Sequence, residues 1–266
     1  MLTFGPHVDG YHDVENQVIH DIQSRAREGF ARQAAEKAAI TTVAEFEQRR
    51  ERLRERFIEA MGGLPTERTP LNVECTGGLD RGTYDIEKLI YESMPNFYVT
   101  AALYIPKGIA EPRPAVIFVH GHSDEGKSYR EYQKVCVDLV ENGFVVMAID
   151  PPGQGERFQY FDPESGKRII GGCTTEHTHA GTQFNLGGAS VGRHFIWDVM
   201  RGIDYLETRD EVDASKIAIT GNSGGGTQTS LLLMSEPRLA AAVPCTFTMT
   251  LEAYMNTGQP QDTEQI

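Results

Sequence analysis

A run of glycines between two regular segments constrains this chain of 266 residues most strongly. The hexapeptide 221–226 (Gly-Asn-Ser-Gly-Gly-Gly) follows a strand-like segment, 216–220, and precedes a helix-like one, 227–234. The chain must therefore pass from a strand into a helix within a few residues. A turn this sharp brings backbone segments together where a β-carbon would clash, which is why it needs glycine.

The spacing Gly-x-Ser-x-Gly at this turn is typical of a nucleophile elbow. Gly221 and Gly225 would allow the close backbone approach, and Ser223 between them would be held in a strained conformation with its hydroxyl exposed. The helix that follows begins with free N–H groups aimed at the site, so the Gly224 N–H could stabilise an oxyanion. In a chain with 27 glycines this spacing can arise by chance, so it is the flanking strand and helix that make it informative.

Strand-like and helix-like segments alternate from residue 115 onward. The predicted strands are 115–120, 144–150, 216–220 and 239–243, and the predicted helices are 129–142, 191–208 and 227–234. Segments 72–75, 84–92 and 97–105 precede them as predicted antiparallel strands. This order predicts an α/β fold with a mostly parallel sheet flanked by helices, where active sites lie at the carboxyl ends of strands.

The first 66 residues are predicted to form a helical extension, and 67–266 the α/β core. Apolar residues recur at helical spacing in the extension, and Thr42–Glu45 has the pattern of a capping box that begins its second helix. Residues 159–190 form a long, polar, glycine-rich insertion. In a compact domain such an insertion is more often a functional lid than a simple connector.

Composition excludes several classes of partner. A net charge of −13 and the lack of a basic patch argue against nucleic acid and acidic membranes as partners. The four cysteines have no C-x-x-C spacing, which favours reduced thiols. The first residues resemble no secretory signal and no apolar run could span a bilayer, so we expect a soluble, cytoplasmic protein, or a secreted one if a signal was removed. Oligomeric state is not predicted.

A second motif competes with the elbow. Residues 121–128 (Gly-His-Ser-Asp-Glu-Gly-Lys-Ser) match the phosphate-binding pattern G-x-x-x-x-G-K-[ST] of P-loop NTPases, between a strand and a helix. Asp124 and Glu125, however, would add two negative charges where a polyphosphate needs bare N–H groups. The same loop suits a hydrolase better, because a strand ending in His120-Gly121-His122 can supply a second backbone donor to an oxyanion.

These motifs occur in the order of a known family. The loop 120–122, the segment 150–157 (Asp-Pro-Pro-Gly-Gln-Gly-Glu-Arg), the segment 197–206 and the elbow together resemble an α/β-hydrolase of the acetylxylan-esterase-like group, related to dienelactone hydrolases. The resemblance extends from about residue 70 to the last residue. It implies Ser223 as the nucleophile and the N–H groups of His122 and Gly224 as the oxyanion hole. The segments 150–157 and 197–206 are expected to shape loops and to pair their own charges.

The sequence departs from this family in one respect. In this fold the acid and the histidine of the triad follow the serine, yet His194 is the last histidine of the chain. Residues 244–266 are too few for two further strands, so we expect the last strands of the fold to be missing. The triad acid and histidine are therefore unknown, with Glu252 only a remote candidate for the acid. The chain as given is expected to be inactive.

The predicted function is that of a serine carboxylic-ester hydrolase, forming an acyl-enzyme on Ser223 and acting on an acetyl ester of a carbohydrate or another small molecule. The alternatives are a serine peptidase of the same fold, a P-loop NTPase and a non-catalytic fragment. Cys173, His177 and His179 are close in sequence and could hold zinc, but their spacing is loose. No cofactor and no metal are predicted.

Overall fold

The computed structural model describes residues 16–108, 110–246, 248–257 and 262–263. The chain divides into two compact units, which are described separately. One comprises Met1–Arg52 with Met249–Gln261, and the other comprises Leu53–Thr248 with Asp262–Ile266. The domain boundary at residue 66 stays a prediction.

The smaller unit contains helix α1 (Gln17–Ala38), the first half of α2 (Val43–Ala60) and α7 (Leu251–Asn256). The capping box at the start of α2 is confirmed. The Glu45 N–H donates to the Thr42 hydroxyl at 3.2 Å, and the Thr42 N–H donates to the Glu45 carboxylate at 3.0 Å. Helix α7 contacts α1, where the Gln23 amide donates to the Met255 carbonyl at 3.3 Å.

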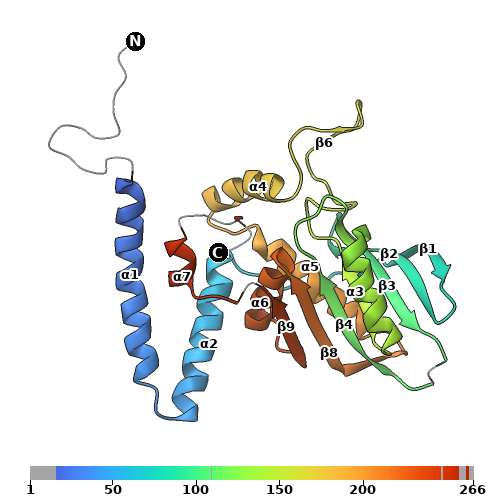
Figure 1. Cartoon of the computed structure of the whole chain (residues 1–266), viewed down its shortest axis with the longest axis horizontal. Coiled ribbons are helices and arrows are strands. Elements are labelled where there is room, and N and C mark those ends of the chain that lie inside the picture. Colours follow the sequence, from blue (N-terminus) through green and yellow to red (C-terminus); the bar gives the residue numbers. More distant parts are fainter. Residues whose placement is uncertain (1–15, 109, 247, 258–261, 264–266) are drawn as a thin grey trace. The chain divides into compact units, whose positions relative to one another are not determined.

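The larger unit is built on a seven-stranded sheet in the order β1-β2-β3-β5-β4-β8-β9. Its strands are β1 (Glu74–Asp80), β2 (Tyr84–Met94), β3 (Phe97–Pro106), β4 (Arg113–Val119), β5 (Val145–Ile149), β8 (Val212–Asn222) and β9 (Ala241–Cys245). Strands β5, β4, β8 and β9 are parallel to one another, and β1, β2 and β3 are antiparallel. The predicted mostly parallel sheet with an antiparallel entry is confirmed (Figure 1).

Helices cover both faces of this sheet, because side chains alternate between faces along each strand. On one face, Phe118, Val146 and Ala148 pack with Cys136 and Val140 of α3 (Arg130–Glu141). The other face carries the larger core, in which the intervening strand residues pack against α5 (Gly192–Leu206) and α6 (Gly224–Ser235). The buried residues of this core from α5 are Ile196, Trp197, Val199, Met200, Ile203, Tyr205 and Leu206.

The insertion 159–190 is more ordered than its sequence suggests. It forms the short strands β6 (Phe161–Asp162) and β7 (Lys167–Arg168) and then helix α4 (Thr174–Leu186). The sequence analysis predicted no helix here, because α4 has no apolar stripe and buries Glu176, His177 and Gly181 instead. A short 3-10 helix, η1 (Gly126–Ser128), precedes α3. Among the described helices, none has the length and apolar character needed to cross a bilayer.

Candidate active site

Strand β8 enters the elbow, and Ser223 is its turning point. Ser223 has φ +56° and ψ −119°, which is a sparsely populated conformation for a residue with a side chain, and α6 begins at the next residue. The predicted strained conformation is therefore present. The Ser223 N–H faces the Cys245 carbonyl at 3.1 Å and the Thr246 hydroxyl at 3.0 Å. The segment after β9 thus fixes the elbow from one side.

The elbow glycines leave no room for side chains. A β-carbon on Gly221 would lie 2.0 Å from the Val119 carbonyl oxygen and 2.7 Å from the backbone of Gly225. A β-carbon on Gly225 would lie 2.0 Å from the same Val119 oxygen. Contacts of this length with rigid backbone are prohibitive, so the close approach predicted from the sequence is present. The elbow is pressed against the carboxyl end of β4.

The loop after β4 lies beside the elbow, as the oxyanion-hole hypothesis requires. The imidazole of His122 covers the start of α6, where a β-carbon on Gly224 would lie 2.8 Å from His122 Cε1. The Gly224 N–H belongs to the first turn of α6, whose N–H groups have no partner within the helix. The structure thus brings together the backbone segments of both predicted donors. Their role toward an oxyanion stays a proposal.

A cluster that the sequence analysis missed adjoins this loop. Asp262 Oδ2 lies 3.1 Å from His122 Nε2 and 2.7 Å from His177 Nδ1, and the two imidazole centroids are 5.3 Å apart. His177 and Asp262 are both buried. His177 Nε2 also lies 2.7 Å from the Pro152 carbonyl oxygen. No local sequence pattern indicates this cluster, because its members come from a loop, a helix and a residue 85 positions beyond His177.

The other two residues considered as possible zinc ligands, His179 and Cys173, have different contacts. His179 stacks edge-on against Tyr160 with centroids 4.7 Å apart. The Cys173 thiol donates to the Asp124 carboxylate at 3.2 Å. The pKa of Cys173 is raised to about 12, mainly because the thiol is partly buried and secondly because of this hydrogen bond. Among the described residues, the group with metal-ligand proximity is His122, His177 and Asp262. Glu252 is exposed on α7 and stays an untested candidate for the triad acid.

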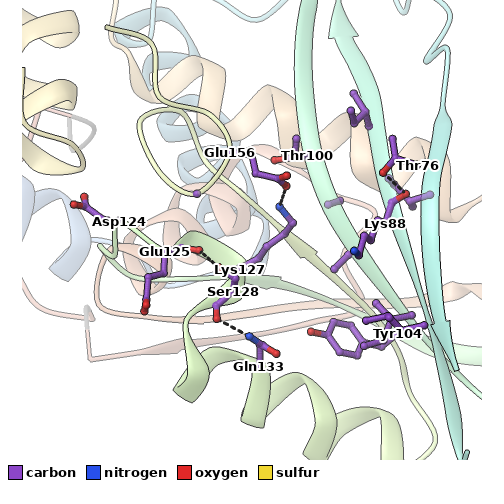
Figure 2. Close-up of a pocket in the computed structure, with 17 residues that line it drawn as sticks. Thr76, Lys88, Thr100, Tyr104, Asp124, Glu125, Lys127, Ser128, Gln133 and Glu156 are labelled. Carbon is purple, nitrogen blue, oxygen red and sulfur yellow. Dashed lines mark hydrogen bonds and ion pairs between the residues drawn. The ribbon is translucent and has the colours of Figure 1, made fainter. Parts of the chain in front are cut away.

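The P-loop-like segment does not form a phosphate cradle. Its lysine, Lys127, pairs through its ammonium with Asp150 and Glu156, and its backbone N–H donates to Asp150 at 2.7 Å. Figure 2 shows Lys127 directed at Glu156 across the loop. The Lys127 ammonium and backbone N–H, which would bind a phosphate in a P-loop, therefore bind the protein's own carboxylates.

Asp150, at the end of β5, is the centre of a buried network. Its carboxylate receives hydrogen bonds from the Thr100 hydroxyl at 2.7 Å and from Lys127, and lies 3.3 Å from His120 Nε2. Burial alone would raise the pKa of Asp150, but the His120 and Lys127 contacts hold it well below its usual value. His120 is fully buried and stacks on Tyr132, as expected for a loop-packing histidine.

Charged residues of segments 150–157 and 197–206 also pair with each other, as predicted. Arg157 on the first segment lies 2.8 Å from Asp198 on the second, and both side chains are almost completely buried. Arg157 also donates to the Asp150 carbonyl at 2.8 Å. These residues hold the loop after β5 against α5.

In the described part of the chain, the surface has hollows away from the elbow. One, of about 450 Å³, lies over β1–β3 and η1 and includes Lys88, Lys127 and Tyr104 (Figure 2). The other, of about 470 Å³, includes Tyr98 and Phe158. Neither has Ser223 among its lining residues. The volume of these hollows is not by itself evidence for an active site, so the elbow remains the candidate site.

A mostly parallel sheet with helices on both faces, carrying a strained serine between strand β8 and helix α6, defines the α/β-hydrolase class. The chain belongs to the acetyl xylan esterase family, whose model matches residues 80–249, more than half of the chain. The predicted resemblance and fold class are confirmed.

Individual relatives agree with this assignment. The chain is 28% identical over 188 residues to "Putative hydrolase YtaP" of Bacillus subtilis (strain 168), covering 65% of this chain and 56% of the relative. A solved "putative acetyl xylan esterase" from Bacteroides fragilis superimposes with a TM-score of 0.62 at 21% identity, over 75% of this chain and 53% of that one. An acetyl xylan esterase from Paenibacillus sp. R4 gives a TM-score of 0.51 at 20% identity, over 75% and 57%. The chain thus spans about half the length of these relatives.

Proposed function

We propose that this chain carries the nucleophile and oxyanion donors of a serine carboxylic-ester hydrolase. The observation that carries the proposal is the elbow, in which Ser223 has a strained conformation between strand β8 and the N-terminus of helix α6. Membership of the acetyl xylan esterase family supports it independently. Neither observation depends on the charged loops around Asp150.

In the proposed reaction, Ser223 Oγ attacks the carbonyl carbon of the ester and its proton passes to a base. The carbonyl oxygen becomes an oxyanion, which the backbone N–H groups of Gly224 and His122 stabilise. Collapse of this intermediate expels the alcohol and leaves an acyl group on Ser223, and water then releases the acid. The triad acid and base are not assigned.

The proposed substrate is an acetyl ester of a carbohydrate or of another small molecule. The family description and the names of two structural relatives support an acetyl ester on a sugar. The net charge of −13 also favours an uncharged substrate over an anionic one such as a nucleic acid.

We further propose that the chain of 266 residues, tested alone, turns esters over slowly. No histidine follows Ser223 in this sequence, and both ring nitrogens of His177 face partners other than the serine. A serine hydroxyl without a base is a poor nucleophile at neutral pH, so the remaining rate would come from slow attack by Ser223 with the help of the oxyanion donors.

Hydrolysis of p-nitrophenyl acetate tests these proposals. We expect slow release of p-nitrophenol that is lost in Ser223→Ala and retained in Ser230→Ala, which removes a hydroxyl bonded within α6. Turnover at about 1 per second or faster would contradict the slow-turnover proposal. Hydrolysis that survives Ser223→Ala would contradict Ser223 as the nucleophile.

A further inference from the structure

Three potential metal ligands converge beside the elbow from separate parts of the larger unit. His122 comes from the loop after β4, His177 from α4, and Asp262 from the last described segment. Their ligand atoms, two imidazole nitrogens and one carboxylate oxygen, all lie within 4.8 Å of one another. A zinc ion bound at about 2.0–2.2 Å by such ligands requires this kind of spacing.

The hydrogen bonding of His177 fixes which nitrogen faces the cluster. A carbonyl oxygen can only accept, so the contact of 2.7 Å to Pro152 requires a proton on His177 Nε2. In the neutral imidazole the Nδ1 lone pair then points at Asp262 Oδ2, which is 2.7 Å away. Two electron-rich atoms at this separation need a cation next to them, either a proton or a metal ion.

The same contact is what a metal-binding histidine normally has. Such a histidine donates its second N–H to a carbonyl or carboxylate, which orients the ring and increases its basicity as a ligand. Pro152 supplies that carbonyl, and both His177 and Asp262 have side chains 2% exposed. A carboxylate buried to this degree is costly unless hydrogen bonds or a positive charge pair with it, and a cation between Asp262 and the two imidazoles would provide such pairing.

We propose that His122, His177 and Asp262 form a binding site for a divalent transition metal ion of the zinc type. Two imidazoles and one carboxylate suit zinc better than calcium or magnesium, which prefer oxygen ligands. Three protein ligands are also the number found in zinc sites that keep a position for water or substrate. The proposal goes beyond the esterase chemistry, which requires only backbone groups of His122.

A metal ion here would connect three segments, the loop after β4, helix α4 and the segment of Asp262. The His122 ring covers Gly224, so an ion on His122 Nε2 would fix the loop whose backbone N–H is proposed for the oxyanion hole. It would also anchor α4 of the 159–190 insertion through His177. The expected effects are therefore on metal content and on the stability of the larger unit, independently of catalysis.

Titration of the metal-free chain with ZnCl2 by calorimetry tests the proposal. We expect one Zn²⁺ per chain and a rise in melting temperature on binding. Because loss of even a second-shell partner costs about 10–100-fold in affinity, His177→Gln and Asp262→Asn should each weaken binding by at least about 100-fold. His179→Gln is the matched control on the same helix and should leave the affinity unchanged.

Two measurements on the unmodified chain keep the test valid if a variant fails to fold. Co²⁺ should give the visible absorption of a tetrahedral site, and Zn²⁺ should protect His122, but not His179, from modification by diethyl pyrocarbonate. Absence of saturable Zn²⁺ binding would overturn the proposal and leave a proton between His177 and Asp262. Zn²⁺ binding that survives both ligand substitutions, or leaves His122 reactive, would also overturn it.

Discussion

The loop after β5 and the loop after β8 reach the same edge of the sheet by different physical means. The first, residues 150–157, is held by buried charges that pair with one another. The second, at the elbow, is held by backbone contacts that exclude any β-carbon. The buried charges of the first loop are all used in ion pairs with other residues of the protein, such as Lys127–Asp150 and Arg157–Asp198. The second loop instead presents a serine in a strained conformation. A charged motif near a candidate active site can therefore be structural, while the proposed nucleophile lies in a nearly uncharged turn.

The largest effect is expected at the elbow glycine Gly225. In Gly225→Ala the new methyl group would lie 2.0 Å from the Val119 carbonyl oxygen, and rigid backbone must move to relieve the clash. We expect destabilisation by more than about 4 kcal/mol, or failure to fold. Denaturation in urea measures it. Gly29→Ala in the middle of α1 is the control, because the nearest atom there is the end of a flexible arginine at 3.9 Å, and should be neutral or slightly stabilising. Similar stability of the two variants would contradict the steric account.

A smaller effect is expected for the buried pair between Arg157 and Asp198. Asp198→Ala leaves the guanidinium of Arg157 buried without its carboxylate, which typically costs about 3–4 kcal/mol. Replacing both partners with apolar residues, as in Arg157→Met with Asp198→Leu, should recover much of this loss, because it removes the unpaired charge. A double-mutant cycle in urea measures the coupling. Additive losses would show that the pair does not hold the loop.

Lys127→Met should cost less, about 2 kcal/mol at pH 7, because Asp150 keeps its contacts with His120 and Thr100. The pKa of Asp150 is lowered in the folded state. Its contribution to stability is therefore present above its unfolded pKa of about 3.9 and is lost as the pH falls toward the folded pKa. The difference between wild type and Lys127→Met should thus shrink below about pH 4. A constant difference would contradict this linkage.

The variant Lys127→Met also distinguishes the P-loop NTPase alternative from the proposed esterase function. Lys127 pairs with the protein's own carboxylates, so we expect no saturable binding of Mg-ATP in calorimetry, with or without the substitution. Saturable binding that depends on Lys127 would restore the nucleotide-binding interpretation of residues 121–128.

The fold was predictable from the sequence where local patterns and packing agree. Short apolar runs such as 115–120 and 144–150 became the buried parallel strands, and the glycines at 221 and 225 fixed the elbow. Helix α4 was not predictable, because its buried residues are polar and its helical pattern is weak. Its order depends on tertiary contacts.

Only the elbow serine and the backbone amides of the candidate site were predictable from the sequence. The glycine spacing indicated Ser223 and its neighbouring amides, because the turn requires glycine at fixed offsets. The motif indicated a role for His122 only through its backbone N–H and none for its imidazole, and Asp262 carried no local signal. Their contact with His177 depends on three segments meeting in space, which no periodicity encodes.

Prolonged labelling with a fluorophosphonate followed by peptide mapping tests the central claim most directly, because the probe reports the most reactive serine without requiring turnover of an ester. The oxyanion donors should make Ser223 the most reactive serine even though its attack is slow without a base. We expect the label on Ser223, its loss in Ser223→Ala and its retention in Ser230→Ala. Label on another residue, or equal labelling of the Ser223→Ala variant, would contradict the assignment of the elbow serine as the nucleophile.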